Sequence, residues 1–161
     1  VPRLYEILHD RINASYQHKG IINLKMLDRA VYLSRKTLQK IPLTLLERIE
    51  NSYLNLTVRR HINARLGGRL KAFVSGGAAL DPNIGYFFLA LNIPILQGYG
   101  QTEASPVITA NPPKKIKIET VGKLLVGVEA KLTKQGEICV RGDLLMKGYW
   151  NDPIATKKKI A

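Results

Sequence analysis

The sequence has little of what would crosslink a fold, bind a metal through histidine and cysteine, or carry the chain across a membrane. Its single cysteine, Cys139, excludes an intrachain disulfide, which fits a reducing compartment. The three histidines stand apart in the sequence, without the spacing of a metal site. No apolar run approaches the roughly 18 residues of a membrane-spanning helix. With 161 residues and a hydrophobic fraction of 45%, the chain is expected to form a globular domain with its own core.

The beginning of the sequence does not resemble a secretion signal. Val1-Pro2-Arg3 contains neither methionine nor the start of an apolar segment. Cys139 stands between Ile138 and Val140 in an apparent strand, and is therefore expected to be a buried structural thiol. These features together predict a cytoplasmic location.

Positive charge is in excess but is not gathered into a nucleic-acid site. The net charge is +13, with 14 Lys or Arg against 5 Asp or Glu in residues 1–71, and 11 against 7 in residues 72–161. Tight basic runs occur at residues 114–117 and 157–159, and no aromatic residues that could stack on bases alternate with them. A solvated basic surface is therefore favoured over nucleic-acid binding. Attraction to anionic lipid or to polyanionic small molecules is the remaining alternative.

The first part of the sequence has the apolar spacing of helices. Residues 3–18, about 24–39 and 45–66 place apolar side chains on one helical face, and a break is expected between residues 55 and 60. Lys19-Gly20 and Gly67-Gly68 are typical of helix ends. No residue in these helices suggests chemistry.

A β-α-β unit is predicted after the helices. Residues 70–74 alternate like a strand, and Asp81-Pro82 is typical of a helix start, with the helix running over residues 82–91. An apolar run over residues 93–97 predicts the second strand. Because such units are almost always parallel and right-handed, the two strand ends are expected to meet at one edge of the sheet.

The residues after the second predicted strand carry groups suited to a nucleotide. Gly98 and Gly100 flank Tyr99, whose flat ring can lie against a planar base. Thr102 supplies a hydroxyl for a phosphate oxygen, and Glu103 a carboxylate of the kind that Mg²⁺ accepts beside phosphates. The other interpretation is structural: Tyr99 packs on the core, while Thr102 and Glu103 cap a helix. The residues alone leave both interpretations open.

Three motifs, in order along the chain, resemble those of the adenylate-forming ligases, which include acyl-CoA synthetases, peptide-synthetase adenylation domains and luciferase. G-Y-G-Q-T-E at residues 98–103 resembles the family's Y-G-x-T-E signature. S-G-G-A at residues 75–78 resembles its S-G-G-A loop, and G-E-I-C-V-R-G at 136–142 with G-Y-W at 148–150 resembles its G-E-[IL]-x-[VI]-[RK]-G…G-Y motif. The opening V-P-R-L-Y-E is similar to a segment of the long-chain fatty acyl-CoA synthetases.

The resemblance implies an AMP-forming fatty acid–CoA ligase, which activates a carboxylate with ATP to an acyl-adenylate and transfers the acyl group to CoA. Its catalytic roles would fall on Thr102, at the α-phosphate, and on Glu103, at Mg²⁺. Tyr99 would stack on adenine. The other residues implied to bind nucleotide or acyl-adenylate are Gly76, Gly77, Ala78, Gln97, Gly98 and Gly100. The implied partners are fatty acid and CoA, with no nucleic acid, and a further expectation is peripheral association with the inner membrane face.

The fold implied by the resemblance is α/β. Residues 1–118 would belong to a parallel-sheet αβα adenylating domain, and residues 119–161 to a truncated, β-rich subdomain that forms a small β-barrel in the family. No stretch matches the family's triphosphate loop, its ribose-binding aspartate or its C-terminal lid domain with the catalytic lysine. The chain is therefore expected to be a fragment that is inactive alone. The alternatives are a ligase for an aryl acid or an amino acid, and an inactive product of a split or decayed gene.

Overall fold

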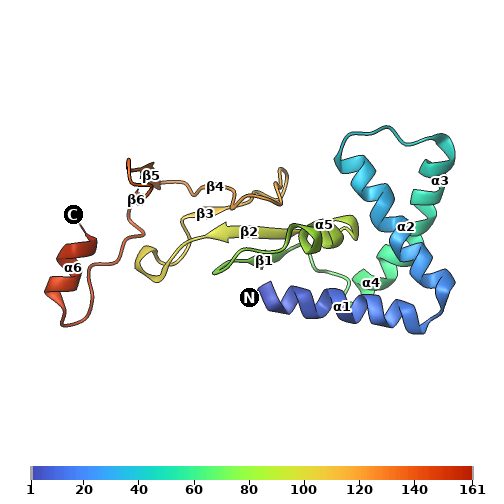
Figure 1. Cartoon of the computed structure of the whole chain (residues 1–161), viewed down its shortest axis with the longest axis horizontal. Helices are drawn as coiled ribbons and strands as arrows, with labels where there is room; N and C mark the ends of the chain where they lie inside the picture. Colours follow the sequence, from blue (N-terminus) through green and yellow to red (C-terminus); the bar gives the residue numbers. More distant parts are fainter. Residues whose placement is uncertain (1, 161) are drawn as a thin grey trace. The chain divides into compact units, whose positions relative to one another are not determined.

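The chain folds into two compact units, residues 1–96 and 97–161, in a computed structural model that describes residues 2–160 (Figure 1). The first unit is mostly helical and contains the start of the sheet. The second consists of short strands, turns and one terminal helix. The boundary predicted near residue 118 concerns parts of a full-length ligase and stays a prediction.

The helices of the first unit follow the predicted spacing closely. They are α1 (Pro2–His18), α2 (Ile21–Leu38), α3 (Leu45–Leu54) and α4 (Arg60–Arg65). Between α3 and α4 the chain does not break; instead it widens into a π-helical turn, η1 (Asn55–Arg59), at the place where a break was predicted. Such turns occur where one extra residue is accommodated within a continuous helix.

The start of α3 is fixed by its own side chains. The Thr44 hydroxyl accepts a hydrogen bond from the backbone N–H of Glu47, and the Glu47 carboxylate accepts one from the backbone N–H of Thr44. This reciprocal pair satisfies two backbone donors that the first turn of a helix leaves without partners. The Lys36 ammonium donates to the same carboxylate at 2.7 Å, so α2 and α3 are joined at this point.

Aromatic rings join the helices of the first unit to its sheet. Phe88, fully buried on α5 (Pro82–Ala90), lies edge-on to Tyr5, Phe73 and Phe87, with ring centroids 5.4 to 6.4 Å apart. Edge-to-face rings at this spacing add specific attraction to the burial of apolar area. The Tyr5 hydroxyl also donates to the backbone carbonyl of Val74. These rings form the part of the core where α1, α5 and the first strand meet, and side chains of α2, α3, η1 and α4 contribute to the same cluster.

Arg59 is a buried charge at the centre of the helical region, only 3% exposed. Its guanidinium donates to the backbone carbonyls of Ala90 and Ala30, at 2.7 and 3.0 Å, and to the Ser34 hydroxyl. Burial lowers the pKa of this guanidinium from its usual value. Because its partners are polar groups of α2 and of the end of α5, one side chain connects three segments of the unit.

The predicted β-α-β unit is present. Strand β1 (Phe73–Ser75), helix α5 and strand β2 (Ile95–Tyr99) follow in order, and the N–H of Phe73 donates to the carbonyl of Pro94 at 2.9 Å. The Asp81 carboxylate caps α5 by accepting from the N–H of Asn83 at 2.8 Å, with Pro82 at the first helical position, as predicted. The strands join a four-stranded sheet of order β1-β2-β3-β4, which confirms a mixed α/β fold with a parallel pair.

The second strand lies two residues further along than the sequence pattern predicted. It was expected over residues 93–97, whereas β2 spans Ile95–Tyr99 and therefore contains Gly98 and Tyr99. The prediction followed the apolar run, but the ladder is set by pairing: Gly98 pairs with Ala110 and Tyr99 with Thr109 in the antiparallel strand β3 (Thr109–Ala110). Tyr99 consequently belongs to the strand end rather than to the loop after it.

The rest of the second unit is built from short strands. Strand β4 (Lys123–Leu124) pairs with β3, and β5 (Glu129–Leu132) forms an antiparallel hairpin with β6 (Ile138–Arg141). Helix α6 (Pro153–Lys159) begins at Asp152, whose carboxylate accepts from the N–H of Ala155. The described residues form these two sheets rather than a closed barrel. Cys139 is only half-buried on the hairpin, so the prediction of a buried thiol was wrong.

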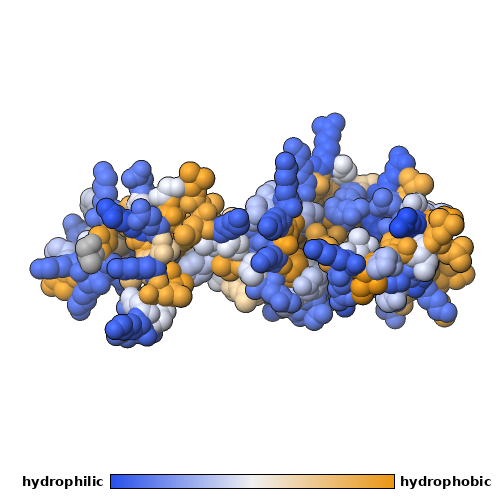
Figure 2. All heavy atoms as spheres, turned by 90° about the horizontal axis from the view of Figure 1, so that it is seen from above, coloured by the Kyte–Doolittle hydropathy of each residue, from blue (hydrophilic) through white to orange (hydrophobic). Residues whose placement is uncertain are grey.

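One helix of the first unit exposes apolar side chains. Five of them on α3 and η1 are 58% to 78% exposed, and we call them the α3 stripe: Leu45, Leu46, Ile49, Tyr53 and Leu56. Figure 2 shows apolar side chains gathered at the right-hand end, over α3. Among the described residues, none of the helices combines the length and the apolar character that crossing a bilayer requires.

Candidate nucleotide site

The turn after β2 carries the residues that the sequence singled out. The strand ends at Tyr99, and a single 3₁₀ turn, η2 (Thr102–Ala104), follows. Its N-cap residue is Gln101, with no capping hydrogen bond from a side chain, and Ser105 closes it in the left-handed region at φ 49°. Thr102 is exposed and Glu103 half-buried, while Ala104 is fully buried and anchors the turn. The idea that Thr102 and Glu103 serve to cap a helix is therefore not favoured.

Gly98 and Gly100 are needed because backbone passes close to them. A Cβ at Gly98 would lie 2.8 Å from the carbonyl oxygen of Thr109, and one at Gly100 only 1.8 Å from that of Pro106. Neither glycine has a positive φ, so glycine is required here by the close approach of backbone rather than by a left-handed conformation. The returning segment 106–110 occupies the space beside them. Whether the faces of the Tyr99 ring are open to a base stays a prediction.

Tyr99 lies at the end of the strand and outside the apolar core. Its side chain is half-buried, and the buried core cluster of the protein, which includes Tyr5 and Tyr16, does not contain it. Its backbone carbonyl accepts from the N–H of Ile108 at 2.9 Å, which fixes the strand end against the returning segment. A half-exposed ring on a fixed strand end is compatible with stacking on a base. That contact stays a prediction.

Glu103 is held by residues far away in the sequence. The Tyr149 hydroxyl donates to its Oε1 atom at 2.7 Å, and the N–H of Met146 donates to its backbone carbonyl at 2.9 Å. The hydrogen bond from Tyr149 holds the pKa of the Glu103 carboxyl below its usual value and raises the pKa of the Tyr149 hydroxyl. Glu103 is therefore a charged carboxylate with a defined orientation.

The donor set fits a magnesium ion that brings most of its own ligands. Within residues 2–160 there is no group of three or more His, Cys, Asp or Glu side chains that could hold a metal by itself. Mg²⁺ is commonly bound by one or two carboxylates, with waters and substrate phosphates completing an octahedron. Glu103, with Oε1 engaged by Tyr149, offers one such carboxylate. The site could accept Mg²⁺ together with a nucleotide, but not a bare ion held by protein alone.

Gln97 on β2 and Asn111, directly after β3, are joined by hydrogen bonds. Both side chains are buried, at 8% and 3% exposure. The Gln97 amide donates to the carbonyl of Ile118, and the Asn111 N–H donates to the Gln97 carbonyl at 2.8 Å. The Asn111 side chain also accepts from the N–H of Lys117 at 2.9 Å. Gln97 thus has a structural function here, and its predicted contact with an acyl-adenylate is untested. No pattern in the sequence indicated Asn111.

The S-G-G-A residues form the turn between β1 and α5 in the first unit. Gly77 has φ +85° with open space around it, and both Gly77 and Ala78 are exposed, while Gly76 is half-buried. Ser75 is 1% exposed, and its hydroxyl has no hydrogen-bond partner among the described residues. A backbone turn with small side chains allows close approach of a ligand. That Gly76, Gly77 and Ala78 meet Tyr99 in one site remains a prediction.

Comparison with known proteins decides the family. The family model described as "AMP-binding enzyme" matches residues 1–150. The chain belongs to the AMP-binding enzyme family.

The relatives of this AMP-binding chain include ligases of fatty and aryl acids. It is 34% identical to the long-chain-fatty-acid–CoA ligase FadD15 of Mycobacterium bovis, over 97% of this chain and 26% of that protein. It is 36% identical to 4-coumarate–CoA ligase 3 of Oryza sativa, over 56% of this chain and 20% of that protein. The matches span about a fifth to a quarter of the length of these relatives.

Solved structures show the same fold. The apo form of MatB from Rhodopseudomonas palustris matches with a TM-score of 0.52 and 27% identity, over 68% of this chain and 24% of that protein. The α/β class that the resemblance implied is thus confirmed.

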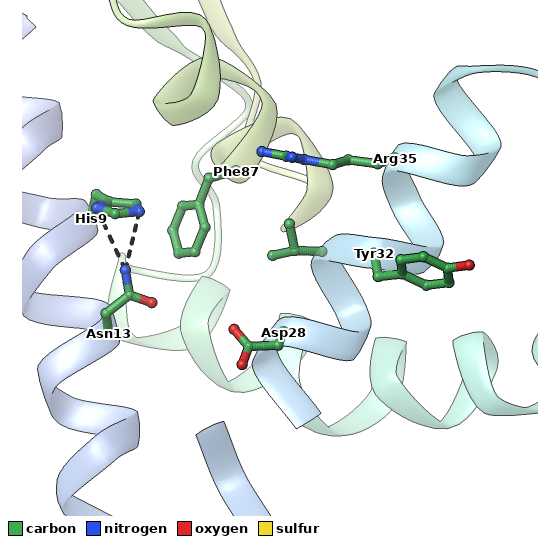
Figure 3. A pocket seen from close by; sticks show the side chains of 7 residues that line it. His9, Asn13, Asp28, Tyr32, Arg35 and Phe87 are labelled. Carbon is green, nitrogen blue, oxygen red and sulfur yellow. Dashed lines mark hydrogen bonds between the residues drawn. The ribbon is translucent and has the colours of Figure 1, made fainter. Parts of the chain in front are cut away.

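A separate hollow of about 330 Å³ lies among α1, α2 and α5 of the AMP-binding chain (Figure 3). Its lining includes His9, Asn13, Asp28, Arg35 and Phe87, and none of the predicted site residues. Asn13 and His9 are hydrogen-bonded at 3.1 Å, and the His9 ring lies edge-on to Phe87 with centroids 4.6 Å apart. Its lining carries charges of both signs, on Asp28 and Arg35, and we assign no ligand to it.

Proposed function

We propose that this chain is part of a ligase that activates a carboxylic acid with ATP and transfers the acyl group to CoA, with a long-chain fatty acid as substrate. The observation that carries the proposal is the turn after β2, where the Y-G-x-T-E residues follow a fixed strand end and Glu103 is held in one orientation. The match to a long-chain fatty-acid ligase over nearly the whole chain supports the acid class.

In the proposed reaction, a carboxylate oxygen of the acid attacks the α-phosphorus of ATP. The bond from that phosphorus to the bridging oxygen breaks, and pyrophosphate leaves. The thiol sulfur of CoA then attacks the acyl carbonyl, AMP leaves, and the thiol proton is lost to solvent. Fixed dipoles and charges at the α-phosphate are the main means of accelerating such a displacement.

Each residue has a proposed task in this site. The Tyr99 ring lies against adenine, and the exposed Thr102 hydroxyl donates to an α-phosphate oxygen. Glu103 would hold Mg²⁺, which when bound would supply charge neutralisation at the phosphates. Backbone of the small-residue turn, Gly76, Gly77 and Ala78, lines the adenine and acyl side, together with the strand end at Gln97 and Gly98.

A test of the proposal is ATP–pyrophosphate exchange with palmitate in the full-length enzyme that contains this chain. Glu103→Gln keeps the size of the side chain but removes its charge, and should lower kcat by about 10²–10³-fold, as losing one such electrostatic contact typically does. The matched control is Glu129→Gln, at an exposed position of β5, which should leave kcat unchanged. Equal kcat in both variants would contradict the role of Glu103. The 161-residue chain alone should show no exchange.

The acid class has one specific competitor. The similarity to a 4-coumarate ligase favours an aryl acid, although it covers only about half of this chain. A comparison of kcat/KM for palmitate and 4-coumarate in the same exchange assay separates the two. A preference for the aryl acid would overturn the fatty-acid assignment while keeping the reaction class.

We also propose peripheral association with the anionic, cytoplasmic face of a membrane. The α3 stripe presents apolar side chains beside the exposed basic residues Lys40 and Arg48, a combination typical of helices that lie in a lipid interface. Co-sedimentation with vesicles of phosphatidylcholine and phosphatidylglycerol tests it. Leu46→Glu should abolish binding, whereas Leu132→Glu, at a similarly exposed position of β5, should not. Equal binding by both variants would exclude this surface.

A further inference from the structure

Tyr149 contacts the centre of the candidate site from a distant part of the sequence. It belongs to the G-Y-W turn, 46 residues after Glu103, and the sequence indicated no chemical role for it. Its hydroxyl donates to Glu103 Oε1 at 2.7 Å, while Met146, three residues earlier, donates from its N–H to the Glu103 carbonyl at 2.9 Å. Both the backbone and the carboxylate of Glu103 are therefore held by one short segment.

The segment that holds Glu103 is itself fixed. The backbone N–H of Tyr149 donates to the Thr156 hydroxyl at 2.9 Å, and that hydroxyl donates to the backbone carbonyl of Asp152 at 2.7 Å. Tyr149 and Asp152 also form an antiparallel bridge. Asp152 caps α6, so the orientation of the Tyr149 ring is tied to the start of a helix. A tyrosine on such a support has a defined hydroxyl position.

We propose that Tyr149 is a positioning residue that orients the Glu103 carboxylate for the metal–nucleotide complex. The inference rests on the proposed metal role of Glu103 and extends it. By engaging Oε1, the Tyr149 hydroxyl selects one rotamer of a flexible side chain and leaves Oε2 for the cation. Groups that hydrogen-bond metal ligands in this way reduce the ordering cost of binding, and their loss weakens metal affinity about 10–100-fold.

The competing explanation is that Tyr149 only fastens the 146–149 segment to the turn at η2. The two explanations differ in what Tyr149→Phe should do. A fastening role predicts a lower Tm with unchanged metal affinity. A positioning role predicts weaker metal binding, even though the ring and the backbone bond from Met146 are retained.

The experiment measures Mn²⁺ binding, as a spectroscopic substitute for Mg²⁺, by electron paramagnetic resonance in the full-length enzyme with ATP present. Tyr149→Phe should weaken binding about 10–100-fold. The Mg²⁺ concentration needed for half-maximal pyrophosphate exchange should rise by a similar factor. The matched control is Tyr32→Phe, which removes a hydroxyl from an exposed ring that lines no predicted site, and it should bind Mn²⁺ like the wild type.

A double-mutant cycle with Glu103→Gln isolates the pair. If Tyr149 acts through Glu103, adding Tyr149→Phe to Glu103→Gln should cause little further loss of Mn²⁺ affinity. Additive losses, or wild-type affinity in Tyr149→Phe when Glu103→Gln alone weakens binding, would overturn the positioning role and leave the proposed function intact. Unchanged affinity in Glu103→Gln would instead overturn the metal role of Glu103, and this inference with it.

Discussion

The two units of the chain are stabilised by different kinds of contact. In the described part of residues 1–96, helices and the start of the sheet bury a continuous apolar cluster, in which Tyr5, Phe73 and Phe87 pack edge-on against Phe88. In the described part of residues 97–161, the buried apolar side chains are Ala104, Ile108 and Ile118. The second unit is held instead by close backbone contact at Gly100 and by the hydrogen bonds of Asn111 and Tyr149.

This difference separates stability from chemistry. Apolar burial is non-directional and tolerates changes of shape, so it suits a supporting region. Hydrogen bonds and close backbone contacts fix atoms in one geometry, which is what a site that must place a carboxylate and a ring requires. Tyr99, Thr102 and Glu103 all lie in the second unit.

The largest expected effect is on the first unit. Phe88→Ala removes the ring at the centre of the aromatic cluster and should lower the free energy of unfolding by about 3–5 kcal/mol. Thermal melting followed by far-UV circular dichroism measures it. Leu46→Ala, at a side chain that is 78% exposed, is the control and should change stability by about 0.5 kcal/mol or less. Similar losses in the two variants would show that the core is not where we place it.

The second unit should be sensitive to a single methyl group. Gly100→Ala would place Cβ within 1.8 Å of the Pro106 carbonyl oxygen, and the strain of moving that backbone should cost about 1–3 kcal/mol. Amide hydrogen exchange should show faster opening of residues 97–110 and unchanged protection in α2 and α5. Uniform loss of protection in both units would mean that they do not behave separately. Ser52→Ala, at an exposed position of α3, serves as the control.

Tyr99→Ala in the full-length enzyme distinguishes a stacking ring from a packed one. Base–aromatic stacking is worth about 1–3 kcal/mol in single-strand nucleic-acid binders, so the KM for ATP should rise roughly five- to a hundred-fold. Because Tyr99 lies outside the core cluster, Tm without nucleotide should stay nearly constant. A large drop in Tm with unchanged ATP affinity would assign Tyr99 to packing instead.

The smallest effect concerns the first turn of α3 and its response to pH. Hydrogen bonding to the Lys36 ammonium holds the pKa of the Glu47 carboxyl below its usual value. The stability that this carboxylate contributes is therefore present above its unfolded pKa and is lost as pH falls through the lower, folded pKa. Thr44→Ala should cost about 0.5–2 kcal/mol at neutral pH, because the cap is lost.

The acid dependence can be measured separately. Melting curves between pH 7 and pH 3 should show a smaller acid-induced loss of Tm in Glu47→Gln than in the wild type. An identical acid dependence in the variant would show that other carboxylates dominate it.

Local sequence predicted the parts of the fold that local forces decide. Helical spacing placed α1 and α2 within a few residues, and Asp81-Pro82 marked the start of α5 correctly. The position of β2 was missed by two residues because strand bounds depend on pairing with β3, which an apolar run does not encode.

For the candidate site, too, the sequence indicated some features and missed others. The Y-G-x-T-E residues were singled out from their resemblance to a family, and the structure places them at one strand end and in the turn after it, while their roles stay predictions. The purpose of Gly98 and Gly100, and the hydrogen bond from Tyr149 to Glu103, were not foreseen, because each depends on chain segments that are distant in sequence. Cys139 was misjudged because alternation along a strand does not reveal whether anything covers it.

The buried Arg59 has a consequence for how the helical region loses structure. Its guanidinium joins η1 to α2 and to the last turn of α5, and a guanidinium fork cannot be reproduced by a lysine. If any one of these segments unfolded locally, the N–H groups of the buried Arg59 guanidinium would lose their hydrogen-bond acceptors. The three segments should therefore open together in amide hydrogen exchange, as one cooperative unit, rather than one helix at a time.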